Sequence, residues 1–311
     1  MLSKIGAGPL FLLTVIAWGG TNFAIEWQIA AAAPEPAIAY RYGLCALLMF
    51  GFVALRGQPL RFRLQDHVWF ALLGAFFFSI NYILLYHSQV YLVSGVVAIT
   101  FSTMVLFNIL FAAIFLGDRI HFNVVFGAVL GLSGIALMFW PDLVKFDLNG
   151  DALKGLGLSL LGSATASMAS IVGARNQRAG LPILSQNAWA MLYGTGIVAV
   201  VALLRGAPWA IQWSWGLAIS SLYLIPIATL LGFFLYFALI ARIGPDRAGY
   251  VMIVYPLSAM VLSTLFEDFT WTPLSAVGAV IVLVGNIFAM TGRRTARGLP
   301  AAAPAPTSAG S

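Results

Sequence analysis

Residues 101–140 read FSTMVLFNILFAAIFLGDRIHFNVVFGAVLGLSGIALMFW. This stretch connects one long apolar run, 90–116, to a second, 122–140, through a short polar segment. A helix needs about 20 mostly apolar residues to cross the hydrocarbon core of a bilayer. Both runs reach about that length, so the stretch predicts two membrane-spanning helices joined by a tight turn.

The same pattern recurs along the whole chain and predicts an all-α polytopic membrane protein with ten transmembrane helices. The expected helices lie at 9–29, 36–55, 68–86, 90–116, 122–140, 153–173, 185–204, 215–241, 247–266 and 273–291. Charged residues make up only 8% of the chain, against about 25% in an ordinary soluble domain. Apolar residues make up 61%, which is more than a soluble fold of 311 residues could hide.

The Lys and Arg residues between the runs sort onto alternate sides of the expected membrane. Twelve lie on the side that includes both termini, and three lie on the other side. Cytoplasmic loops carry the excess of Lys and Arg, so we expect both termini in the cytoplasm. The net charge of +6 is spread over loops rather than gathered in one patch, so we expect no nucleic-acid partner. The thirteen Arg against three Lys, with much Ala and Gly, are typical of a GC-rich bacterial genome and favour the inner membrane.

The two ends of the chain need separate interpretation. Lys4 precedes the first apolar run, as in a signal peptide, but the run is longer than a typical signal-peptide core. We therefore expect it to remain as the first helix, with cleavage as the alternative. The last residues, 293–311, are rich in Pro, Ala and Ser and predict a disordered cytoplasmic tail.

A short motif occurs twice, about 150 residues apart. FLGD at 115–118 ends the fourth run, and LFED at 265–268 ends the ninth. A pair of glycines seven residues apart follows each motif: Gly127 and Gly134, then Gly278 and Gly285. The alternative explanation is chance similarity between Leu- and Gly-rich helices.

The repeat predicts how the two halves are arranged. Each half contains five expected helices, and a unit with an odd number of spans places the second copy upside down relative to the first. We therefore predict two inverted five-helix repeats, 1–145 and 146–292. This ground plan is common among secondary transporters, whose substrate site lies near the midplane between the halves.

Several motifs resemble those of EamA-type transporters of the drug/metabolite transporter superfamily. WGGTNF at 18–23 is similar to the family's W-G-s-n-F signature, Arg41 matches an Arg early in the second helix, and FLGDR at 115–119 is similar to the f-l-G-E-r ending of the fourth. The resemblance covers about 9–291 and implies a 5+5 inverted repeat that transports small metabolites by alternating access. Asp118 replaces the usual Glu, and 163–170 lacks the Trp equivalent to Trp18, which implies an asymmetric cavity.

Polar and aromatic side chains at membrane depth are the candidate substrate-binding residues, because polar groups that persist in hydrocarbon usually face a cavity. Trp18 and Asn22 are four residues apart and share one face of the first helix. The other candidates are Phe78, Asn81, Tyr82, Tyr86, Asn108, Ser163, Ser167, Tyr236, Tyr250 and Tyr255. Such residues also serve plain helix packing, which is the alternative for Phe78 and Tyr86 above all.

Two charges and two prolines complete the set of candidate residues. Glu26 and Arg41 lie at similar depth below the outer surface, and we expect a structural ion pair between them. The alternative is that each side chain reaches separately to the membrane surface. Pro226 and Pro256 interrupt the eighth and ninth helices and predict hinges.

The expected cavity is aromatic and weakly polar, which suits small neutral or zwitterionic organic metabolites. Amino acids with aromatic or hydrophobic side chains are examples, and we expect the chain to export them. Phosphorylated substrates would need several fixed cations. A lipid or other amphipathic-compound carrier or scramblase of the same fold is the alternative, and a channel is disfavoured because polar rings do not recur across the helices.

We expect neither enzymatic activity nor a cofactor. The sequence contains no G-x-x-x-x-G-K-[ST] loop for ATP, and His67, His87 and His121 lack the paired spacing of a metal site. Glu26 is the only carboxylate expected within the membrane, so facilitated transport is favoured over proton coupling. The expected partners are a small-molecule substrate and the lipid bilayer, with the chain as a monomer or a weak homodimer.

Overall fold

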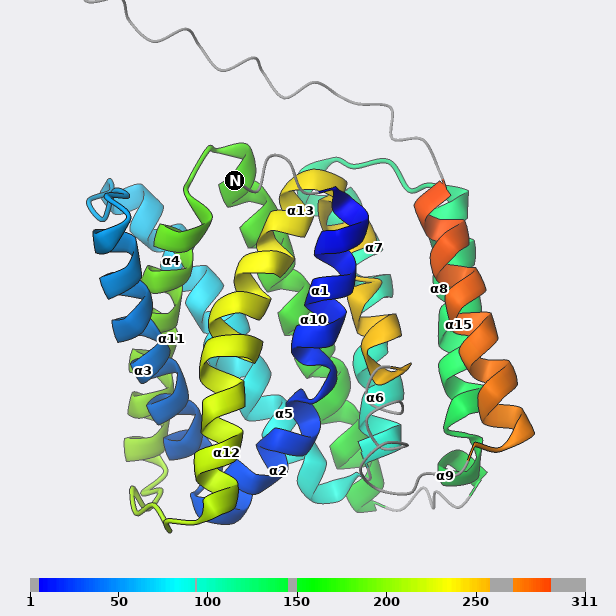
Figure 1. The fold of residues 1–311 in the computed structure, drawn as a ribbon, viewed down its shortest axis with the longest axis horizontal. Helices are drawn as coiled ribbons and strands as arrows, with labels where there is room; N and C mark the ends of the chain where they lie inside the picture. Colours follow the sequence, from blue (N-terminus) through cyan, green and yellow to red (C-terminus); the bar gives the residue numbers. More distant parts are fainter. Residues whose placement is uncertain (1–5, 93, 145–149, 258–270, 292–311) are drawn as a thin grey trace, which may run out of the picture.

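The computed structural model describes residues 6–92, 94–144, 150–257 and 271–291, and their regular secondary structure is helical. The helices run side by side in one bundle (Figure 1). Seven are long and apolar enough to cross a membrane: Ala7–Ala31, Pro34–Leu55, Leu64–Tyr91, Ile99–Leu116, Gly150–Arg178, Ile183–Leu204 and Trp215–Ala248. Two shorter apolar helices are Phe122–Met138 and Pro273–Ala289. The remaining predicted span, 247–266, is helical at 247–248 and 251–257, with a turn at 249–250. Residues 258–266 lie outside the described residues, as does the predicted tail.

Most of the expected spans in the first half consist of more than one helical segment. The segments are α1 (Ala7–Gly19), α2 (Thr21–Ala31), α3 (Pro34–Leu55), α4 (Leu64–Ala75), η2 (Phe76–Ile80), α5 (Asn81–Tyr91), α6 (Ser94–Ser102), α7 (Met104–Leu116), α8 (Phe122–Met138) and the short α9 (Trp140–Val144). The first span is broken at Gly20, and the fourth is broken at Thr103.

The second half begins with two long unbroken helices. Its segments are α10 (Gly150–Arg178), α11 (Ile183–Leu204), α12 (Trp215–Tyr223), η3 (Leu224–Leu231), α13 (Gly232–Ala248) and α15 (Pro273–Thr291). The third span of each half contains a π-helical segment, η2 in one and η3 in the other. π-Helical turns interrupt the regular i→i+4 hydrogen bonding and are frequent at functional sites.

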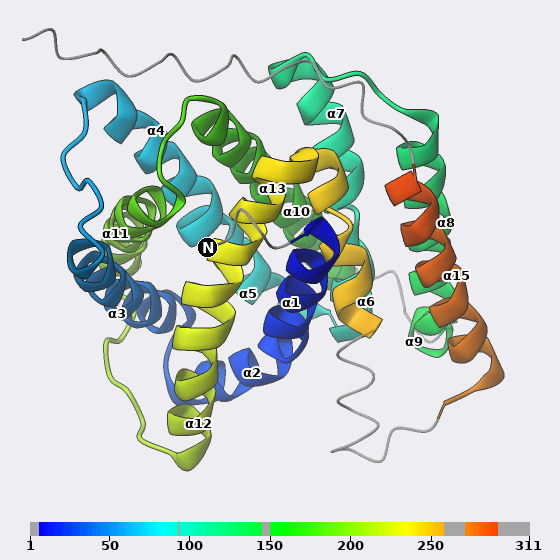
Figure 2. The same ribbon diagram turned by 45° about the horizontal axis from the view of Figure 1, so that its top comes forward.

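The last spans of the two halves pack against each other in antiparallel orientation. Gly127 of α8 faces Gly285 of α15, and Gly134 faces Gly278. Figure 2 shows the two helices side by side at one edge of the bundle, as Figure 1 does. Small residues let membrane helices approach backbone to backbone, and the four glycines of the repeated motif form this contact. The predicted inverted arrangement of the two halves requires this antiparallel pairing of their last spans.

The outer surface of the bundle is apolar, and its charges pair at the two ends. Leu47, Leu222 and Ile287 are among the many exposed large apolar side chains, as expected of surfaces that face lipid. Arg178 pairs with Asp118 at one end, and Arg205 pairs with Glu35 at the other. Asp118 and Arg178 lie in predicted loops of the Arg-rich side, and Glu35 and Arg205 lie in predicted loops of the other side, so each pair joins residues from one side of the membrane. The chain is a multi-pass membrane protein.

Candidate functional site

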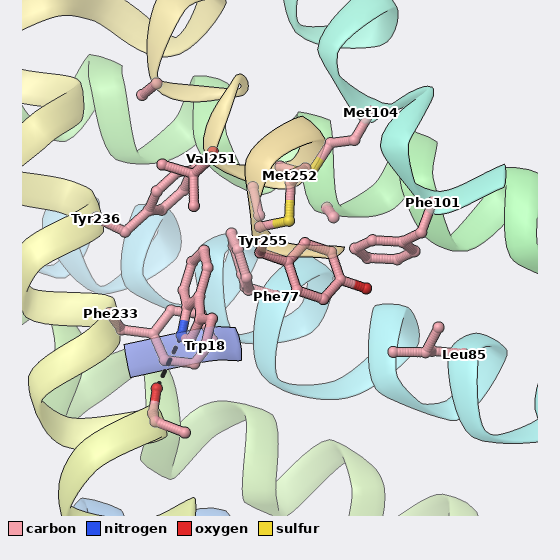
Figure 3. Close-up of a cluster of buried hydrophobic side chains, with 14 of the residues drawn as sticks. Trp18, Phe77, Leu85, Phe101, Met104, Phe233, Tyr236, Val251, Met252 and Tyr255 are labelled. Atoms are coloured by element: carbon pink, nitrogen blue, oxygen red, sulfur yellow. Dashed lines mark hydrogen bonds between the residues drawn. The ribbon is translucent and has the colours of Figure 1, made fainter. Parts of the chain in front are cut away.

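A cavity lies in the middle of the bundle, among spans from both halves. Its lining comprises Trp18, Thr21, Ile25, Phe77, Asn81, Tyr82, Leu85, Phe101, Phe233, Met252 and Tyr255. Figure 3 shows the side chains of several of these residues converging from different helices. The centre of a water molecule can occupy about 50 Å³ of the cavity. One water needs about 10–15 Å³ by this measure, so the cavity holds a few waters in this conformation.

Trp18 connects the broken first span to the π-helix of the other half. Its Nε1 donates a hydrogen bond to the carbonyl oxygen of Ala228 in η3, at 2.9 Å (Figure 3). Its ring centroid lies 5.3 Å from that of Phe233 and 5.0 Å from that of Tyr236. Gly232 makes this approach possible, because a Cβ there would lie 2.5 Å from Trp18 Nε1. The indole is therefore held at the cavity by a buried polar contact and by ring packing.

The break in the first span falls within the WGGTNF motif beside the cavity. The Tyr223 hydroxyl donates to the carbonyl oxygen of Ala17 at 2.8 Å and accepts from the backbone N–H of Gly20 at 3.2 Å. The hydroxyl thus takes a place in the hydrogen-bond network where the helix ladder is interrupted. Discontinuous helices of this kind surround the substrate sites of many secondary transporters. The predicted span 9–29 is therefore present as Ala7–Ala31, with a turn at Gly20 that interrupts it.

Asn81 and Tyr82 bring the polar groups of the third span to the cavity. Asn81 is buried, and its side-chain oxygen has no hydrogen-bond partner among the described residues. It is therefore the best-placed acceptor for an N–H group of a bound molecule, because an unpaired buried acceptor is costly. The Tyr82 ring lies 5.2 Å from that of Tyr42 and 6.2 Å from that of Tyr86.

Arg41 is held by contacts other than the expected ion pair. Its Nε and Nη2 both donate to Thr229 Oγ1, at 3.0 and 2.9 Å. Its guanidinium carbon lies 5.1 Å from the ring centroid of Tyr42 and 5.4 Å from that of Tyr82. Arg41 is buried, whereas Glu26 occupies an exposed position of α2, and the Glu26–Arg41 pair stays a prediction.

The predicted site residues fall into three groups. Trp18, Asn81, Tyr82 and Tyr255 line the cavity. Phe78, Tyr86, Asn108, Ser163, Ser167, Tyr236 and Tyr250 are buried and are not part of its lining. Asn22 lies in α2, and its side chain lies outside the described part of the structure.

Most residues of the second group have packing partners that account for their burial. The Asn108 amide donates to the carbonyl oxygen of Pro245, and the Ser163 hydroxyl donates to that of Thr100. Tyr236 shares a hydrogen bond with Ser170, Tyr250 donates to the Val124 carbonyl oxygen, and the Phe78 ring packs against Tyr42 and Phe233. Tyr236 does not line the cavity, but its ring contacts that of Trp18, which does.

The two predicted hinges differ in what the structure shows. Pro226 lies within η3, so it coincides with an irregular segment of the eighth span. A proline supplies no backbone N–H to the helix ladder, which favours such an interruption. Pro256 lies in the helical stretch 251–257, near the limit of the described residues, and its role as a hinge stays a prediction.

Seven lining residues were absent from the sequence-based set: Thr21, Ile25, Phe77, Leu85, Phe101, Phe233 and Met252. In the third span the expected line was Phe78, Tyr82 and Tyr86, but Phe77, Asn81 and Leu85 lie on the cavity together with Tyr82. The line that reaches the cavity is thus offset by one residue from the expected line, and its first member, Phe77, lies in the π-helical turn Phe76–Ile80. The i, i+4 spacing of 77, 81 and 85 was the available signal.

Comparison with known proteins agrees with this architecture. The model of the EamA-like transporter family matches residues 7–140 and 153–291. Protein PagO of Salmonella typhimurium is 23% identical over 303 residues, which cover 96% of each chain. In Escherichia coli K12, the uncharacterized inner membrane transporter YedA is 25% identical, covering 89% of each chain. A probable amino-acid metabolite efflux pump of the same strain is 24% identical, covering 93% of this chain and 97% of the pump.

A solved crystal structure shows the same fold. It superimposes with a TM-score of 0.76 at 15% sequence identity, over 91% of this chain and 96% of the other. The fold is thus shared at a level of sequence identity that says nothing about substrate.

Proposed function

This chain belongs to the EamA-like transporter family, and on that premise we propose that it exports small neutral or zwitterionic organic metabolites. Amino acids with apolar or aromatic side chains are the substrates we favour. It is a transporter and not an enzyme. One relative is named a probable amino-acid metabolite efflux pump and another an inner membrane transporter, which supports this substrate class, export, and a location in the bacterial inner membrane.

The composition of the cavity lining carries the proposal. Six of its eleven residues are aromatic, two are the polar Thr21 and Asn81, and none of the described lining residues is charged. Aromatic faces and aliphatic side chains favour a substrate with an apolar part, and the Asn81 oxygen offers an acceptor for its polar part. A phosphorylated substrate would require cations that this lining lacks.

Alternating access is supported by where the irregular segments lie. The break at Gly20, η2 and η3 all adjoin residues of the cavity, and each interrupts a span that lines it. The cavity holds only a few waters in this conformation, so an amino acid needs these spans to move apart before it can enter. Segments with irregular hydrogen bonding are the places where such motion costs least.

Counterflow in reconstituted vesicles tests the proposal. Purified protein in liposomes preloaded with unlabelled phenylalanine should take up labelled phenylalanine saturably, without a pH gradient. We expect Trp18→Ala to lower uptake at low substrate by about three- to tenfold, through loss of ring packing. Trp213→Ala is the matched control, because Trp213 is 75% exposed and lies away from the cavity. Absence of saturable counterflow for every amino acid tested would contradict the proposal.

Lipid movement is the other candidate for this fold. The same vesicles, labelled with a fluorescent phospholipid, report scrambling when a membrane-impermeant reductant quenches the outer leaflet. We expect the protein to leave the protected fraction unchanged. Scrambling in the absence of amino-acid counterflow would favour the lipid carrier instead.

A further inference from the structure

Arg41 is a buried cation without a carboxylate partner among the described residues. It lies in α3, and only 3% of its surface is exposed. Two of its nitrogens share the single oxygen of Thr229, and the third, Nη1, is buried without a hydrogen-bond partner. A guanidinium presents five N–H donors in a fixed fork that matches a carboxylate. Thr229, a neutral hydroxyl, leaves much of that capacity and the whole charge uncompensated.

The rings around Arg41 compensate the charge only in part. Tyr42 and Tyr82 lie at cation–π distances from its guanidinium carbon. The hydroxyls of Tyr42 and Tyr86 are buried without hydrogen-bond partners. Three neighbouring side chains thus combine a cation, a free guanidinium nitrogen and two free hydroxyls in one region. All of these groups can donate a hydrogen bond to an anion, and ionisable groups persist at membrane depth mainly where they have a function.

Tyr82 connects this region to the cavity, because it lines the cavity and its ring centroid lies 5.4 Å from the guanidinium carbon of Arg41. Thr229, which holds Arg41, follows Ala228, which holds Trp18, so both contacts fall on the π-helix η3. η2 ends immediately before Asn81 and Tyr82. The π-helix η2 therefore ends just before Tyr82, and the π-helix η3 contains Thr229, the partner of Arg41.

We propose that Arg41 is the anchor for the carboxylate group of the substrate, and that Tyr82 separates it from the cavity until substrate enters. The substrate class narrows to carboxylate-bearing metabolites, with the apolar part held by Trp18 and Phe233 and an N–H group held by Asn81. This inference rests on the proposed function and deepens it. The carboxylate would replace Thr229 as the main acceptor of Arg41.

Competition in the counterflow assay tests the anchor. Uptake of labelled phenylalanine by wild-type protein should be inhibited by 3-phenylpropionate, which keeps the carboxylate, and much less by phenethylamine, which lacks it. In Arg41→Gln we expect the concentration of 3-phenylpropionate for half-inhibition to rise about 10- to 100-fold, with that of phenethylamine unchanged. For Arg41→Lys this concentration should lie between the values for the wild type and Arg41→Gln, because the ammonium keeps the charge but lacks the forked geometry of the guanidinium. Arg56→Gln is the control, since Arg56 is an exposed arginine.

The outcomes separate this inference from the proposed function. Wild-type counterflow that phenethylamine inhibits as strongly as 3-phenylpropionate overturns the anchor, even if Arg41→Gln fails to fold. An equal loss of affinity for both competitors in Arg41→Gln and Arg41→Lys also overturns it, because a merely structural role predicts that result. Absence of counterflow in the wild type is instead a failure of the proposed function.

Discussion

Gly127 of α8 and Gly285 of α15 meet backbone to backbone: a Cβ on Gly127 would lie 2.6 Å from the Gly285 carbonyl oxygen. The reverse approach, from Gly285 to the Gly127 oxygen, is 2.8 Å. Gly134 and Gly278 repeat the relationship at 2.7 and 2.6 Å. Gly127 and Gly278 each begin the glycine pair that follows one copy of the repeated motif, so the two contacts correspond as an inverted repeat requires.

We therefore expect Gly127→Val and Gly278→Val to destabilise the protein by similar amounts. Each side chain would separate α8 from α15, and overpacking of this kind costs about 1–3 kcal/mol or more. The midpoint of thermal unfolding in detergent measures the effect. Gly51→Ala is the control, because a Cβ at Gly51 meets nothing within 4 Å. Loss of stability at only one of the two equivalent positions would contradict the symmetry.

The glycine contact shows which parts of the fold the sequence could predict. Long apolar runs, alternating charges and the repeated motif all follow from simple physical rules, because hydrocarbon thickness fixes span length and small residues fix close contacts. The antiparallel pairing of α8 with α15 follows from the inverted repeat itself. These rules act on whole helices and do not depend on which face each residue presents.

The cavity was predicted less well, because it depends on which face each helix turns toward the other spans. Trp18, Asn81, Tyr82 and Tyr255 were found from their polarity or aromatic character. Phe77 and Leu85 were missed because they are apolar, and nothing in the sequence tells their face of the third span from the face of Phe78 and Tyr86.

Gly232→Ala should impair transport through its effect on Trp18. The new methyl group would lie 2.5 Å from Trp18 Nε1 and 3.0 Å from its Cδ1, so the indole must move and lose its bond to Ala228. We expect counterflow at low substrate to fall about tenfold, the equivalent of about 1.4 kcal/mol. Gly196→Ala, a helical glycine with nothing within 4 Å of its Cβ position, should retain normal uptake. Equal rates in both variants would remove Trp18 from the site.

Tyr223→Phe should destabilise the conformation of the chain at the interruption between α1 and α2. The substitution removes the hydroxyl that bonds Ala17 and Gly20, and we expect a loss of about 1–2 kcal/mol in the free energy of unfolding. Hydrogen exchange should also become faster at the backbone N–H of Gly20, which loses one of its two acceptors. Tyr91→Phe is the control, since Tyr91 is 41% exposed. If exchange at Gly20 is unchanged, the hydroxyl does not stabilise the break.

The ion pairs at the two ends of the bundle should differ in strength, because they differ in burial. The Glu35 side chain is only 5% exposed and accepts from Arg205 Nη1 at 2.8 Å, with His87 Nε2 at 3.0 Å. The Asp118 side chain is 27% exposed and contacts Arg178 Nη2 at 2.7 Å. We expect Glu35→Gln to cost about 1–3 kcal/mol and Asp118→Asn less than about 1 kcal/mol.

Salt provides the second measurement for this pair of variants. Raising NaCl from about 0.1 to 1 M shortens the Debye length from about 10 to 3 Å, which screens exposed pairs far more than buried ones. The destabilisation caused by Asp118→Asn should therefore shrink at high salt, while that caused by Glu35→Gln should persist. Unfolding midpoints at both salt concentrations decide the matter. A larger effect at Asp118, or loss of the Glu35 effect in salt, would mean that burial does not set the strength of these contacts.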